Sequence, residues 1–217
     1  MEPFSTHTGI IATLNRSNVD TDQIIPKQFL KSILRSGYGV SAFFDWRYLA
    51  DGKPNPEFEL NHPRFDGRSI LVTRNNFGCG SSREHAVWAL AQDGYRVIIA
   101  PWKEISGERV PGFADIFRNN SVKNGLLLVE LAEEEVDRIF ALVSGHEGLQ
   151  ATVDLADQKV TVHAPDPVIF SFEIEEGDKE RLIGGLDDIA VSLQYEADIT
   201  RFEHSHPEYF IKVNQQS

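Results

Sequence analysis

The feature that most constrains the fold is a strand, turn, helix and strand pattern in the middle of the chain. An apolar run at 69–73 precedes a glycine-rich turn at 75–80, helical spacing from about 82 to 92, and a second apolar run at 96–100. Two buried strands joined through a helix are typical of a parallel βαβ unit. Because parallel strands need helices on the faces of their sheet, the sequence predicts an α/β fold.

Apolar periodicity predicts the other elements. Predicted strands lie at 9–14, 126–129, 152–155, 159–162 and 168–172, and predicted helices lie at 27–35 and 133–143. The last three strands follow one another closely, which favours an antiparallel meander. Helical spacing returns over 178–203, with a break at Gly184 and Gly185. We expect one domain over residues 1–217 with a helical C-terminal tail at about 178–217.

Charge and cysteine content exclude several classes of protein. Lys and Arg number 21 against 33 Asp and Glu, so the net charge of −12 would repel the phosphate backbone of a nucleic acid. Cys79 is the only cysteine, which excludes an internal disulfide and a cysteine-ligated zinc or iron–sulfur site built by this chain alone. No apolar run approaches the ~20 residues that span a bilayer, and the start of the chain has no signal-peptide pattern. We expect a cytoplasmic protein with neither a membrane nor a nucleic-acid partner.

The glycine-rich turn and the residues after it, Asn76 to His85, match none of the common loop chemistries. The Walker lysine is missing, Arg83 replaces the third glycine of the dinucleotide fingerprint, and the nucleophile-elbow pattern is not met. A helix N-terminus here still favours an anion, and Arg83 adds positive charge to it. Ser81 either forms a capping box with Glu84 or takes part in chemistry. His85 is either a general acid or base or a residue that orients the loop.

A second polar cluster, Asp20 and Asp22, precedes a predicted helix. Two carboxylates at this spacing in a turn either bind a metal ion or cap the helix, and capping is the commoner case.

Several segments together carry a family resemblance. They are residues 18–30, 44–49, 54–58, 76–85, 114–117 and 185–189. In order, they resemble the small subunits of 3-isopropylmalate dehydratase, the aconitase-superfamily isomerase of leucine biosynthesis. The resemblance implies the swivelling β/β/α three-layer domain as a separate chain. It also implies an obligatory large subunit, whose cysteines hold a 4Fe-4S cluster, and a hydro-lyase reaction on a small dicarboxylate.

The resemblance assigns roles to residues of both clusters. Ser81 is the base that removes a substrate proton, and Arg83 holds a substrate carboxylate. Ser82, Thr21, Asp22, Phe29 and Leu30 are expected to contact substrate, Gly80 and His85 to orient the loop, and no residue of this chain to bind a metal. The apolar pair Phe29 and Leu30 suits an isopropyl group, and the alternative is that both belong to the core.

Two other functions stay open at this point. One is a related hydro-lyase acting on methylmalate, citraconate or homoaconitate, and the other is a non-catalytic binding module in which Ser81 only caps a helix. Residues 101–112 also form a longer connection than is usual in the family, which we expect either to alter the subunit interface or to cover the site.

Overall fold

The computed structural model describes residues 1–31, 35–80 and 83–205. These residues form a seven-stranded mixed sheet and a separate two-stranded hairpin. In sheet order the strands are β6 (Leu127–Leu131), β3 (Val97–Pro101), β2 (Arg68–Val72), β1 (Thr6–Thr13), β7 (Gln150–Asp154), β8 (Lys159–Val162) and β9 (Val168–Ser171).

The sheet has a parallel half and an antiparallel half that meet at β1. Strands β1, β2, β3 and β6 are parallel, whereas β7 pairs antiparallel with β1. The predicted βαβ unit is confirmed, since α3 (Glu84–Gln92) joins the parallel pair β2 and β3. The predicted meander is also confirmed, because β7, β8 and β9 pair antiparallel in sequence order.

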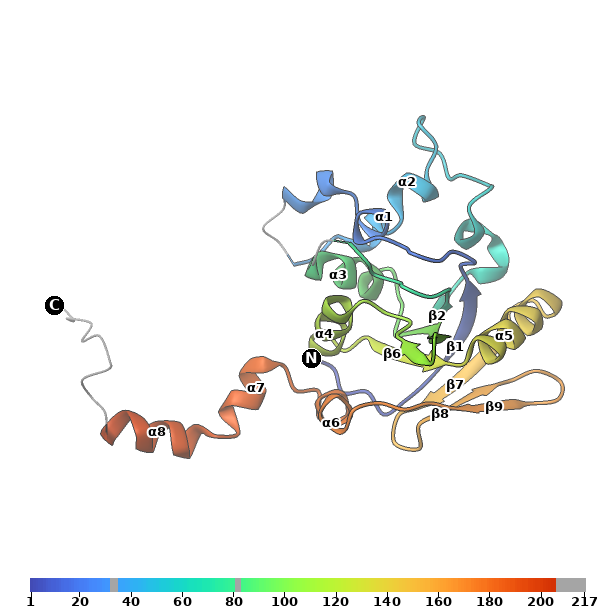
Figure 1. Cartoon of the computed structure of the whole chain (residues 1–217). Coiled ribbons are helices and arrows are strands. Elements are labelled where there is room, and N and C mark those ends of the chain that lie inside the picture. The colour runs from blue at the N-terminus through green and yellow to red at the C-terminus, as the bar shows by residue number, and fades with distance from the viewer. Residues whose placement is uncertain (32–34, 81–82, 206–217) are drawn as a thin grey trace.

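Helices cover the parallel half of the sheet. Figure 1 shows α3 and α4 (Asp115–Lys123) on one side of it and α5 (Glu133–Gly145) on the other. Strand β3 is buried along its whole length, which explains its continuous apolar run. The other α-helices among the described residues are α1 (Thr21–Ile24), α2 (Phe44–Arg47), α6 (Glu176–Gly184), α7 (Asp188–Leu193) and α8 (Glu196–Ser205). The division into one domain over 1–217 with a tail stays a prediction.

Two predicted segments differ from the structure. The helix expected over 27–35 is a 3₁₀ helix over Lys27–Lys31, and residues 32–34 lie outside the described part of the chain. The polar connection at 101–112 contains a β-hairpin, β4 (Lys103–Ile105) and β5 (Glu108–Val110). Its tip turns through two residues of positive φ, Ser106 and Gly107, a hairpin geometry that polar composition alone does not reveal.

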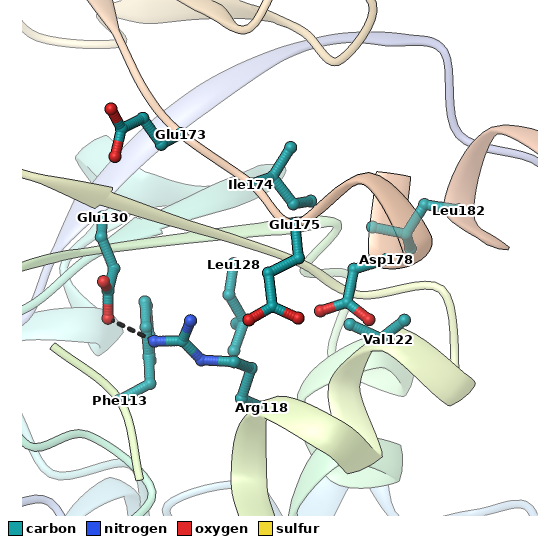
Figure 2. A pocket seen from close by; sticks show the side chains of 10 residues that line it. All are labelled: Phe113, Arg118, Val122, Leu128, Glu130, Glu173, Ile174, Glu175, Asp178 and Leu182. Carbon is teal, nitrogen blue, oxygen red and sulfur yellow. Dashed lines mark hydrogen bonds and ion pairs between the residues drawn. The ribbon is translucent and has the colours of Figure 1, made fainter. Parts of the chain in front are cut away.

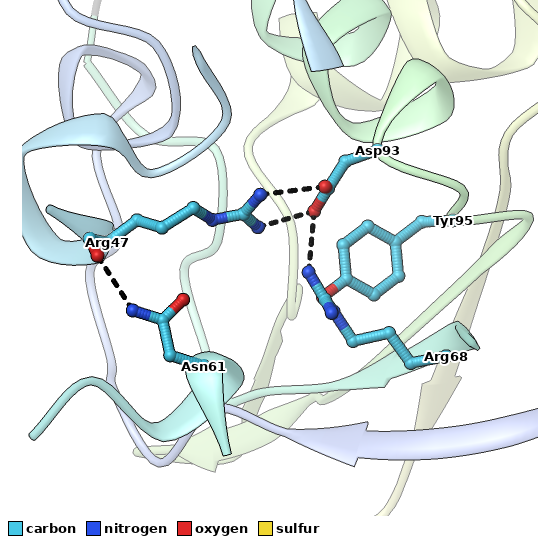
Figure 3. A network of polar contacts seen from close by, with 5 residues as sticks. All are labelled: Arg47, Asn61, Arg68, Asp93 and Tyr95. Carbon is cyan, nitrogen blue, oxygen red and sulfur yellow. Dashed lines mark hydrogen bonds and ion pairs between the residues drawn. The ribbon is translucent and has the colours of Figure 1, made fainter. Parts of the chain in front are cut away.

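A buried ionic network ties the end of α3 to the sheet and to α2 (Figure 3). Arg47 donates to both carboxylate oxygens of Asp93, at 2.8 and 2.6 Å, and Arg68 donates to the same carboxylate at 3.0 Å. Arg68 Nε also donates to the Tyr95 hydroxyl at 2.6 Å, and burial raises the pKa of Tyr95 to about 12. The Arg47 carbonyl accepts from Asn61 at 2.7 Å. The network fixes the position of α3, whose other end points to the glycine-rich turn.

Candidate active site

The glycine-rich turn and two other loops follow the carboxyl ends of β1, β2 and β3. Since these three strands are parallel neighbours, their following loops meet at one edge of the sheet, where α/β folds place their ligands. On one side of the turn, Gly78 N–H donates to the Val19 carbonyl at 2.8 Å. Thr21 N–H donates in turn to the Cys79 carbonyl at 2.9 Å. The turn is therefore attached to the loop that carries the two aspartates.

The loop after the hairpin holds the other side of the turn. Phe77 N–H donates to the Gly112 carbonyl at 2.9 Å, and Ala114 N–H donates to the Phe77 carbonyl at 3.1 Å. Gly78 has a φ of +76°, and a Cβ there would lie 2.2 Å from Cγ of Phe117. Only glycine combines this backbone conformation with so close an approach.

Asp20 is the N-cap of α1. Its side chain accepts from Asp22 N–H at 2.7 Å, and the Gln23 side chain accepts from Asp20 N–H at 2.8 Å, which completes a capping box. Gly80 packs directly on this carboxylate, because a Cβ there would lie 2.1 Å from Oδ2 of Asp20. Of the two roles left open for Asp20, the structure supports capping. Among the described residues, no group of three or more His, Cys, Asp or Glu side chains is placed to hold a metal ion.

Asp22 and Arg83 join the two motifs through an ion pair across 61 residues of sequence. Lys27 Nζ lies 3.3 Å from the other carboxylate oxygen of Asp22. The Arg83 side chain is 20% exposed and that of Asp22 is 37% exposed, so the pair lies at the surface of the site. A guanidinium has five N–H donors, so Arg83 can hold Asp22 and bind a second carboxylate.

A cavity of about 210 Å³ opens beside this ion pair. Its lining comes from the three loops and from the starts of the helices α1 and α4: Thr21, Gly78, Gly80, Arg83, Ala114, Asp115, Ile116 and Phe117. Three of the residues named from the sequence, Thr21, Gly80 and Arg83, thus line one cavity. Residues 114–117 matched the family pattern but were not expected to line the site. Their position after the third parallel strand is the signal that identifies them.

The other expected site residues fall into two groups. Ser81 and Ser82 lie outside the described residues. Phe29 and Leu30 pack against the hydrophobic core, with the Phe29 ring edge-on to Phe44 at 4.8 Å, and neither lines the cavity. Their contact with substrate stays a prediction.

His85 belongs to an aromatic cluster. Its ring lies edge-on to Tyr38 at 5.3 Å and 4.7 Å from Trp88. Of the two roles left open for His85, these contacts favour that of orienting the loop over that of a general acid or base, because the imidazole does not line the cavity.

Of the two roles left open for Ser81, which lies outside the described residues, the helix start does not support the capping box with Glu84. The capping box requires Glu84 at the third position of the helix, whereas α3 begins at Glu84 with Arg83 at the N-cap. The Glu84 carboxylate instead accepts from the Asn124 side chain at 3.0 Å, which links α3 to the end of α4.

A second, smaller cavity of about 30 Å³ lies between α4, β6 and the start of α6 (Figure 2). Arg118 donates to Glu130 at 2.7 Å, and the same carboxylate oxygen accepts from Gly112 N–H at 2.8 Å. Burial, followed by the neighbouring Glu175, raises the pKa of Asp178 in the wall of this cavity. Through these two hydrogen bonds, Glu130 holds both α4 and the loop that contacts the glycine-rich turn. The residues around this cavity therefore support the candidate active site.

Comparisons with known proteins give the family. A family model described as the aconitase C-terminal domain matches residues 1–134. A 3-isopropylmalate dehydratase small subunit from Desulforapulum autotrophicum is 69% identical over 207 residues, covering 95% of this chain and 97% of that protein. The chain belongs to the family of 3-isopropylmalate dehydratase small subunits. A relative of the same description from Neisseria meningitidis is 52% identical over 212 residues and 94% of each chain.

A solved structure supports the fold of this family member. The structure of 3-isopropylmalate dehydratase from Methanocaldococcus jannaschii superposes with a TM-score of 0.62, covering 90% of this chain and 98% of that chain at 21% identity. Together with the aconitase C-terminal domain match and the layered sheet, it confirms the predicted α/β fold class with the swivelling β/β/α architecture.

Proposed function

We propose that this chain is the small subunit of a 3-isopropylmalate dehydratase and works as a hydro-lyase only with its large subunit. The reaction interconverts 2-isopropylmalate and 3-isopropylmalate in leucine biosynthesis, by dehydration to isopropylmaleate and rehydration. The observation that carries the proposal is the 69% identity to a small subunit so named over nearly the whole chain. The same identity to a subunit of an enzyme favours a catalytic role over a non-catalytic binding module.

The 4Fe-4S cluster of this proposal belongs to the large subunit. Such clusters are held by several Cys thiolates, whereas this chain has only Cys79. Burial raises the pKa of the Cys79 thiol, and the Asp20 carboxylate acts in the same direction, so the thiolate that would bind iron is disfavoured. The donors of this chain therefore do not fit a cluster.

The residues of this chain contribute charge and proton transfer. Dehydration removes a proton from the carbon next to a carboxylate, and hydroxide leaves the neighbouring carbon. We propose that Ser81, as its alkoxide, takes the proton and becomes the neutral hydroxyl, and that Arg83 binds the carboxylate on which negative charge builds up. Asp22 holds the guanidinium in place through its ion pair, while Ser82 and Thr21 complete the contacts to the substrate.

We also propose which substrate of the superfamily the complex prefers. We propose that the apolar side chains of Phe29 and Leu30, which pack against the core outside the cavity lining, contact the substrate and favour an isopropyl group over a further carboxylate. A hydrophobic pocket separates substrates that differ by one methylene by only about 1–3 kcal/mol, so a methyl-substituted malate is expected to react slowly rather than not at all.

The test is an anaerobic assay of the chain reconstituted with its large subunit, using 2-isopropylmalate, citramalate and homocitrate in parallel. We expect 2-isopropylmalate to react fastest and Ser81→Ala to remove nearly all of that activity. Ser171→Ala, a change at an exposed residue of the edge strand β9, is the matched control and should keep wild-type turnover. Preference for citramalate or homocitrate would assign the chain to another hydro-lyase, and full activity of Ser81→Ala would refute the role of that serine.

No helix in the described part of the chain is long and apolar enough to cross a membrane. The cytoplasmic location expected from the sequence stays a prediction.

A further inference from the structure

The C-terminal arm, residues 187–205, leads away from the body of the molecule (Figure 1). It consists of α7 and α8, and neither of these fully described helices contains a buried residue. Isolated helices shorter than about 12–15 residues are marginal in water, and α8 has only 10 residues. The arm therefore needs a packing surface to be stable as a helix.

The start of the arm is firmly attached. Asp188 pairs with Lys123 at 2.8 Å and with Arg181 at 3.0 Å, so that α7 begins against α4 and α6. Asp187 caps α7 by accepting from Ala190 N–H at 2.8 Å. These contacts place the start of α7 beside α4 and α6.

Beyond this start the arm exposes large apolar side chains at helical spacing. Ile189 and Leu193 are 71% and 59% exposed and lie four residues apart on α7. Tyr195, directly before α8, and Ile199 are 60% and 43% exposed and also four residues apart. The Tyr195 carbonyl accepts from Ile199 N–H at 2.9 Å, so the two lie on the same side of that helix. Exposed apolar residues that gather on one face mark an interaction site rather than ordinary surface.

The charge of the arm identifies the kind of partner. The arm carries five carboxylates and a single Arg: Asp187, Asp188, Glu196, Asp198, Glu203 and Arg201. At 3.6 residues per turn, Glu203 and Asp198 lie on opposite flanks of the stripe that contains Tyr195 and Ile199. A second copy of this chain, which has a net charge of −12, would bring like charges together.

We propose that the C-terminal arm docks on the large subunit, in an apolar groove flanked by Lys and Arg side chains. This inference rests on the proposed function, because it takes its partner from there. The apolar stripe would fill the groove, and the flanking carboxylates would orient the arm and speed association.

The experiment measures the dissociation constant between the full-length chain and the large subunit, without substrate, for wild type, Ile199→Glu and Ala197→Glu. Both substitutions add one negative charge to an exposed position of α8, but Ala197 lies on the side opposite to Ile199. We expect Ile199→Glu to weaken binding by about 30-fold or more, as for an interface hot spot, and Ala197→Glu by less than about threefold. Thermal unfolding of the isolated chain should be the same for all three, since α8 contains no buried residue.

Equal binding by both variants would overturn the proposal. So would sedimentation showing that the isolated wild-type chain is a dimer that Ile199→Glu dissociates, because the arm would then pair with a second copy. The experiment distinguishes failure of this proposal from failure of the proposed function. If the complex forms through the arm but does not convert 2-isopropylmalate, only the proposed function is refuted. If the complex converts 2-isopropylmalate and Ile199→Glu binds the large subunit as tightly as wild type, only the proposed docking of the arm is refuted.

Discussion

Gly80→Ala tests the packing of the glycine-rich turn on the loop that carries Asp20. Gly80 has a φ of +87°, and an added Cβ would meet the Asp20 carboxylate at 2.1 to 2.7 Å. Gly52 is the matched control, because its φ is +81° and an added Cβ there meets nothing within 4 Å. Both substitutions place an L residue in the left-handed region, which costs about 1–2 kcal/mol.

Only Gly80→Ala also displaces the carboxylate that caps α1. Loss of an N-cap costs about 1 kcal/mol, so we expect Gly80→Ala to lower the free energy of unfolding by about 1–2 kcal/mol more than Gly52→Ala. Urea unfolding of the isolated chain measures this difference. In an Asp20→Ala background both the cap of α1 and the clash with the carboxylate are absent. Adding Gly80→Ala to that background should therefore lower the free energy of unfolding no more than Gly52→Ala does. If both glycine substitutions lower the free energy of unfolding of the wild-type chain equally, the packing of Gly80 on the Asp20 carboxylate does not stabilise the fold.

Three further predictions concern buried or half-buried groups. Asp93→Asn leaves Arg47 and Arg68 buried without their carboxylate, so thermal unfolding should show a loss of about 3–5 kcal/mol, and an unchanged midpoint would contradict the network. Because the pKa of Tyr95 is raised to about 12, its contribution to stability is complete below pH 10 and is lost as the pH rises through 12. The free energy of unfolding should fall by about 2–3 kcal/mol over that range relative to Tyr95→Phe. The raised pKa of Cys79 predicts that iodoacetamide reacts with the folded chain at pH 8 more slowly than with the chain in urea, and equal rates would disprove it.

Local patterns were sufficient to predict most of the sheet. Residues 97–101 are buried along the whole strand, so the apolar character of the run and the flanking turns identify it directly. The hairpin at 103–110 was not predicted, because its strands are short, mostly exposed and polar, and only the positive φ values at 106 and 107 reveal its turn. The 3₁₀ geometry at 27–31 could not be predicted from periodicity either, because the spacing of its apolar residues also fits an α-helix.

The site required information beyond local pattern. Sequence spacing placed Asp22 and Arg83 in separate motifs 61 residues apart, and only the parallel order of β1 and β2 brings them into an ion pair. The assignment of Asp20 as a cap was among the local alternatives, because capping depends on neighbouring residues alone. The start of α3 was predicted less well, because the helix begins at Glu84, about two residues later than its apolar periodicity indicates.

The most direct test of the account is the rate at which isopropylmaleate forms from 2-isopropylmalate under anaerobic conditions, as this chain is titrated into a fixed amount of large subunit. The account predicts that neither chain is active alone and that the rate rises with added chain to a plateau. It also predicts that Arg83→Ala lowers the plateau by at least about 100-fold, because a transition-state charge then loses its partner. A large subunit that is fully active without this chain, or a plateau unchanged by Arg83→Ala, would contradict the account.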